Sequence, residues 1–234
     1  MRTNRWSEAI ELFKASIDKR FTSQACHNIG VAEYQMGHYE AAASFFRQTS
    51  AELEGSACGY AQCLIKLEKT DKAEEVLRSL PFSKESRISD IELAKLYAAL
   101  NRYDDAVYYY NKGWNAEWKK SDWVNGYVYA LFKTDNHTRR RAVLKEAAAH
   151  CDMQMIEAVT DLDEEWTLEQ RKSYIAERQA EKENYQTLLK RLVSGYVPSL
   201  LFEPALESGC YLFGCRCRKA KQSYVEAVGP AAAR

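Results

Sequence analysis

A pattern that returns about every 33 residues constrains the fold of this chain more than any other feature. Four small residues, Ala9, Ala42, Ala73 and Ala106, follow one another at intervals of 33, 31 and 33 residues, with large apolar or aromatic residues around them. A period of this length with alternating small and large residues is typical of stacked helix pairs, in which each pair packs on its neighbours. Such a fold builds an extended surface rather than a deep catalytic cavity.

The clearest copy of the pattern spans residues 25–46 and reads ACHNIGVAEYQMGHYEAAASFF. Gly30 and Ala42 are the small residues that allow two helices to approach closely, and Tyr39 and Phe46 fill the volume around them. Two further copies span 57–80, which keeps Ala73, and 90–110, which keeps Leu93-Ala94, Tyr97, Tyr103, Ala106 and Tyr110.

Local signals divide the chain into helices. Thr22 or Ser23 is a candidate N-cap, Gly37 suits the left-handed end of a helix, and Pro81 ends one. Thr167, with a glutamine three residues later, forms a capping-box pattern that opens a long helix. Ala142 follows Ala106 by 36 residues, so we expect a diverged fourth pair in which the period slips by about three residues. The expected helices are 5–17, 23–36, 39–53, 57–67, 71–80, 91–100, 103–114, 121–132, 138–150 and 168–192.

These observations predict an all-α protein built as an antiparallel helix-pair solenoid, with a long C-terminal helix and an irregular C-terminal segment. Residues 1–150 form the array, in which the first pair is incomplete and the last has diverged. Residues 151–193 hold an acidic turn and a long helix that caps the array or packs along its side. Residues 194–234 carry glycines, prolines and cysteines and lack a helical pattern.

The three copies resemble tetratricopeptide repeats over roughly residues 5–150. The match is incomplete, because Glu33 replaces an aromatic residue, Ala61 replaces the glycine and Thr70 replaces a tyrosine. The resemblance implies that a protein or peptide binds along a concave face lined by the first helix of each pair. Here that face should offer His27, Val31, Tyr34, Cys58, Gln62, Ile65, Ile91, Lys95 and Ala98, extended by Trp123 and Tyr127.

The predicted face suits an apolar extended segment or a helix better than an acidic peptide. Some members of the resembled family bind acidic C-terminal tails through a lysine and asparagine clamp, but His27 and Val31 stand at those positions. Coverage of part of this face by the protein's own C-terminal region is the alternative.

Composition excludes several classes of function. Lysine plus arginine equals aspartate plus glutamate at 33 each, which gives no electrostatic case for nucleic acid or an anionic membrane. The sequence shows neither a signal peptide nor an apolar run long enough for membrane insertion. Seven cysteines, an odd number, fit thiols in a reducing, cytoplasmic setting better than a disulfide framework.

No catalytic or cofactor motif is present, so we expect neither a cofactor nor enzymatic activity. Cys210, Cys215 and Cys217 form C-x4-C-x-C, and with His150 or Cys151 they are weak candidates for a zinc site. The spacing lacks the usual pair of C-x-x-C knuckles, so thiols without metal are the favoured interpretation.

The sequence therefore predicts a non-enzymatic protein–protein interaction module. A dedicated chaperone or immunity-type inhibitor of one cognate protein is the first alternative. A metal-binding or catalytic function in residues 151–217, recruited by the repeats, is the second. The pattern begins in mid-repeat, which is also compatible with a subunit of a larger complex.

Overall fold

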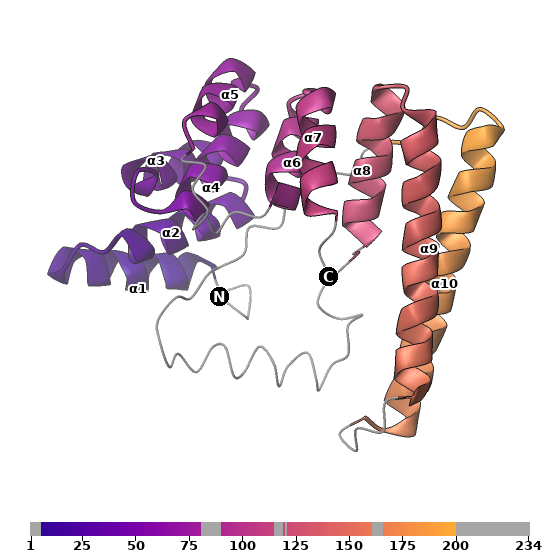
Figure 1. Ribbon diagram of the computed structural model, residues 1–234. Coiled ribbons are helices and arrows are strands. Elements are labelled where there is room, and N and C mark those ends of the chain that lie inside the picture. The colour runs from indigo at the N-terminus through magenta and orange to yellow at the C-terminus, as the bar shows by residue number, and fades with distance from the viewer. Residues whose placement is uncertain (1–5, 81–89, 115–118, 120, 161–165, 200–234) are drawn as a thin grey trace. The chain divides into compact units, whose positions relative to one another are not determined.

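Helices are the regular structure of the described part of the chain. The computed structural model describes residues 6–80, 90–114, 119, 121–160 and 166–199 (Figure 1). Within these residues the all-α prediction is confirmed, and each expected helix is present. Their bounds are α1 Trp6–Lys19, α2 Ser23–Gln35, α3 Tyr39–Thr49, α4 Glu54–Lys66, α5 Thr70–Arg78, α6 Asp90–Ala99, α7 Tyr103–Gly113, α8 Ser121–Lys133, α9 His137–Thr160 and α10 Leu168–Val193.

The helices belong to two compact units, one with α1–α5 and one with α6–α10. In the first unit α1 packs on α2, α2 pairs with α3, α3 packs on α4, and α4 pairs with α5. In the second unit each helix likewise packs on the next, from α6 to α10 (Figure 1). Each unit is thus a run of helix pairs in chain order, as expected for this repeat class.

The turn inside each pair shows that four pairs are equivalent. Gly37, Glu68, Asn101 and Asp135 have φ between 53° and 80° and lie between the two helices of their pairs. After each of them, the next residue donates its backbone N–H to a carbonyl five residues earlier, at 2.8–2.9 Å. This is the Schellman arrangement that ends a helix. The left-handed role predicted for Gly37 is confirmed, and three non-glycine residues share it.

Counting from these turns places the same kinds of residue at the same depth in every pair. Nine residues after the turn lie Phe46, Leu77, Tyr110 and Leu144, which are at most 1% exposed. Five residues after it lie Ala42, Ala73 and Ala106, each 0% exposed, and then Arg140.

The expectation that Ala142 is the small residue of the fourth pair is therefore wrong. The turn at Asp135 follows the turn at Asn101 by 34 residues, so the period does not slip. Arg140 stands at the small position and is buried, with its guanidinium 5.2 Å from the centre of the Phe132 ring and one nitrogen 2.8 Å from Nδ1 of His137. Ala142 is half-exposed.

Two helix ends also differ from the sequence prediction. α3 ends at Thr49 instead of Leu53, and α4 begins at Glu54 rather than Ala57. Ser56 lies inside α4, and its buried hydroxyl accepts a hydrogen bond from Thr49 Oγ1 at 2.8 Å. α9 continues ten residues past His150, since no glycine or proline interrupts it and α10 packs along it. The predicted caps at Thr22 and Thr167 are confirmed, the latter as a complete capping box.

Candidate interaction surfaces

The residues expected on the concave face are mostly interior. α2 shows why, because α1, α3 and α4 all pack on it and residues 25–32 are buried without a break. A first helix enclosed in this way has little side-chain surface left for a partner. Eight of the eleven expected residues are buried, namely His27, Val31, Tyr34, Cys58, Gln62, Ile91, Ala98 and Tyr127, and three are half-exposed, namely Ile65, Lys95 and Trp123.

His27 connects three helices of the first unit. Its Nδ1 lies 2.9 Å from Oγ of Ser56 on α4, which also accepts from Thr49 at the end of α3, and its ring centre lies 5.4 Å from that of Phe46. Burial lowers the pKa of His27 to about 4, so the imidazole is neutral near pH 7. A histidine beside a serine resembles part of a catalytic pair, but His27 is 4% exposed and Ser56 0%, so substrate has no access.

Tyr127 is the centre of a polar network in the second unit. Its hydroxyl donates to Asn111 and accepts from Nε of Arg139 at 3.2 Å. Arg139 donates to Glu146 at 2.9 Å, and Glu146 also accepts from the indole N–H of Trp114. Burial raises the pKa of Tyr127, and the Arg139 guanidinium opposes that rise. The network ties α7, α8 and α9 together, so Tyr127 acts as a packing residue.

The half-exposed residue Lys95 has a partner of its own. Its ammonium forms an ion pair with Asp122, which joins α6 to α8 within the second unit. Ile65 lies near the end of α4, and Trp123 lies in the first turn of α8. These three residues are what the expected face exposes to solvent.

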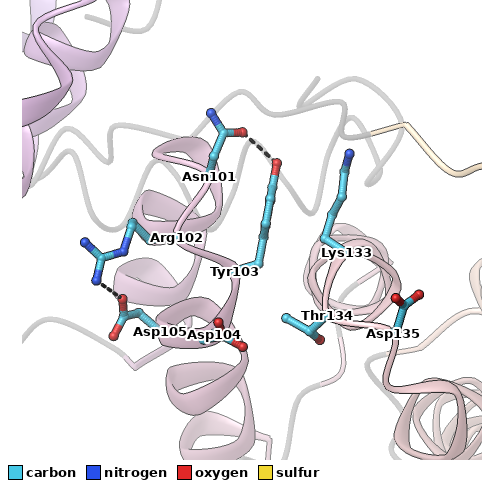
Figure 2. Close-up of a pocket in the computed structure, with 8 residues that line it drawn as sticks. All are labelled: Asn101, Arg102, Tyr103, Asp104, Asp105, Lys133, Thr134 and Asp135. Atoms are coloured by element: carbon cyan, nitrogen blue, oxygen red, sulfur yellow. Dashed lines mark hydrogen bonds and ion pairs between the residues drawn. The ribbon is translucent and has the colours of Figure 1, made fainter.

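A polar cleft that the sequence did not indicate lies at the turns of the second unit (Figure 2). Its volume is about 570 Å³, and it is open to solvent. Stacking of the α6–α7 and α8–α9 pairs brings their turns together, a proximity that no local sequence signal could reveal. Its lining residues are Asn101, Arg102, Tyr103, Asp104, Asp105, Lys133, Thr134 and Asp135.

Tyr103 and Lys133 stand on opposite sides of this cleft (Figure 2). The Tyr103 hydroxyl donates to Asn101 at 2.6 Å, and the Lys133 ammonium lies 5.8 Å from the Tyr103 ring and 5.5 Å from the Tyr129 ring. Burial, followed by the hydrogen bond with Tyr129, raises the pKa of Tyr103 to about 12. The cleft therefore brings together a tyrosine that stays neutral, a lysine and several carboxylates.

The cysteine motif considered for zinc lies outside the described residues, at Cys210, Cys215 and Cys217. Of the proposed additional ligands, Cys151 is a buried thiol whose pKa burial raises to about 11. His150 has a buried Nε2 without a hydrogen-bond partner, and burial lowers its pKa. Across the described segments no three histidine, cysteine or acidic side chains are placed to hold a metal ion.

Comparison with known families agrees with the helix-pair geometry. Residues 23–48, which comprise α2 and nearly all of α3, match the family model described as tetratricopeptide repeat. The resemblance is thereby confirmed for this pair, and the chain carries a tetratricopeptide repeat there. No curated protein and no solved structure matches the chain. Among the helices described, none has the length and apolarity needed to span a bilayer.

Proposed function

We propose that this chain is a non-catalytic module that binds a protein or peptide partner. The observation that carries the proposal is the tetratricopeptide match at residues 23–48, because repeats of this class are typically interaction modules. The recurrence of the same turn in four helix pairs of the described residues supports a similar architecture beyond the matched pair. The buried thiols of Cys26, Cys58, Cys63 and Cys151 favour a reducing, cytoplasmic compartment.

Burial selects the residues through which a partner would be held. Ile65 in the first unit, and Lys95 and Trp123 in the second, are the members of the expected face that retain solvent exposure. The buried members of the expected face pack between the helices that carry these three residues. The cleft between the turns adds acceptors and one lysine for a polar side chain of the partner.

Affinity purification of the full chain from native lysate, with quantitative mass spectrometry, tests this proposal. We expect Ile65→Glu combined with Lys95→Glu to lose the partners that the unchanged chain retains, because both changes alter half-exposed positions. Leu12→Glu is the matched control, since Leu12 is 74% exposed on α1 outside the expected face. Thermal unfolding of each variant checks that the fold is kept.

The same measurement separates the two kinds of binding protein. One partner at equal stoichiometry supports a dedicated chaperone or inhibitor, and several substoichiometric partners support a general adaptor. Partners retained by the double variant at the level of the control would refute binding through this face.

A further inference from the structure

One face of α9 is exposed to solvent, and its side chains change along the helix from a lysine, through an alanine and two large apolar residues, to a glutamate. From the N-terminal side it presents Lys145, Ala149, Met153, Ile156 and Glu157, all exposed. Met153 and Ile156 are 54% and 62% exposed, which is unusual for two large apolar side chains on one helix face. Ala149, Met153 and Ile156 follow one another by four and three residues, the spacing of a coiled-coil seam.

The partner helix α10 packs on the opposite side of α9. Cys151 and Ala158 of α9 and Tyr185 of α10 are buried, and Lys182 bonds to Asp152 at 2.6 Å across the pair. α9 has 24 residues whereas α8 has 13, and Figure 1 shows α9 continuing past the end of α8. Among the described helices of this unit, none covers the seam of Ala149, Met153 and Ile156.

We propose that this seam is a self-association surface and that its occupant is α9 of a second copy of the chain, packed antiparallel about a two-fold axis. With the axis near residue 151, Ala149 of one copy faces Met153 of the other, and Lys145 faces Glu157. Ile156 then enters the space between Ala142 and Ala149 of the other copy, beside the methylene stem of Lys145.

Size and charge both select this antiparallel arrangement. The two alanines lie on the N-terminal side of the axis and the two large apolar residues on the C-terminal side, so antiparallel pairing places large side chains against small ones. Lys145 and Glu157 also lie on opposite sides of the axis. In the antiparallel dimer, Lys145 of each copy therefore faces Glu157 of the other, which gives two ion pairs. Parallel pairing would instead place Lys145 against Lys145 and Glu157 against Glu157.

The same reversal explains why a second copy is favoured over an unrelated helix. A two-fold interface uses one surface patch twice, so the patch must be complementary to itself. The α9 face meets this requirement in side-chain size and in charge about the same point. The inference rests on α9 alone and is independent of the proposed partner binding.

Light scattering or sedimentation of the full chain over a range of concentrations tests the proposal. At about 100 µM we expect a mass approaching twice the chain mass of 26.9 kDa, falling towards the single-chain value on dilution. Ile156→Glu should give a monomer at that concentration, because it removes an apolar contact and the dimer would take a carboxylate out of water in a seam whose lysine is already paired with Glu157. Val193→Glu is the control, since Val193 is 71% exposed on α10 away from the seam, and it should associate like the unchanged chain.

Charge exchange gives a second test that a loss of folding cannot imitate. Lys145→Glu and Glu157→Lys should each weaken association by roughly tenfold or more, because each turns two attractive pairs into two repulsive ones. The double exchange should restore association, since it recreates both pairs with the charges reversed. A chain that is monomeric throughout, a dimer unaffected by Ile156→Glu, or a double exchange without recovery would each overturn the proposal.

Discussion

The α2–α3 pair and the α9–α10 pair differ in how many of their side chains are buried by packing. In the first pair, Phe46 is fully buried and its ring lies against Gly30 and Gly59, so closely that a Cβ at either glycine would be 2.8 Å from ring atoms. In the second pair, α10 has 26 residues but buries only Tyr185 and Leu192 among them. Packing therefore dictates most residues of the repeat pair, whereas the long hairpin leaves its exposed positions available for contact with other molecules.

Truncation of Phe46 should produce the largest difference between the two regions. We expect Phe46→Ala to reduce the free energy of unfolding by about 3–5 kcal/mol, because it removes a buried ring and leaves a cavity between two glycines. Met153→Ala on the exposed face of α9 should change it by less than about 0.5 kcal/mol. Chemical unfolding followed by circular dichroism measures both, and equal effects would contradict the comparison.

Acid should weaken the first unit through His27. Its pKa is about 4 in the folded protein and 6.5 in an unfolded chain, so the unfolded state binds more protons between these values. This contribution to stability is fully present above pH 6.5 and is lost as the pH falls towards 4, by about 3 kcal/mol. The unfolding free energy of His27→Gln should show a correspondingly smaller loss over that range. An unchanged pH dependence in that variant would show that His27 is not the group responsible.

Adding one methyl group at Gly59 should have an intermediate effect. Gly59→Ala brings a Cβ against the Phe46 ring, which is enclosed and cannot move away, so we expect a loss of about 1–3 kcal/mol. Gly37→Ala is an informative comparison because it meets no atom within 4 Å but has φ of +80°. Its cost should be about 1–2 kcal/mol and arise from the backbone alone. Phe46→Leu, by opening space, should relieve the first effect and not the second, as double-variant unfolding would reveal.

The ion pair between α9 and α10 should matter least. Lys182→Ala removes the 2.6 Å contact with Asp152, but both side chains are partly exposed to solvent. We expect a loss below about 1 kcal/mol that diminishes in high salt. Unfolding in low and high salt checks this, and a loss as large as that of Phe46→Ala would mean that the hairpin depends on the pair.

The sequence predicted the order and approximate bounds of the helices because caps, turns and the 33-residue period are local signals. It located the turn of the fourth pair but assigned the small position to Ala142, because an arginine, Arg140, occupies the place that an alanine holds in the other pairs. It ended α9 at His150 because the repeat period was lost there, although nothing in the sequence breaks the helix. Burial of His27 and Tyr127 could not be predicted, since it depends on helices distant in sequence.

The division between packing residues and contact residues is tested most directly by the molar mass and thermal unfolding of Ile156→Glu, measured together with the unchanged chain. The account predicts a variant that is monomeric at about 100 µM and that has the same unfolding temperature as the unchanged chain when both are diluted until the unchanged chain is also monomeric, because Ile156 is 62% exposed and contributes to association rather than to the fold. A variant that remains dimeric, or one that unfolds at a clearly lower temperature, would contradict it.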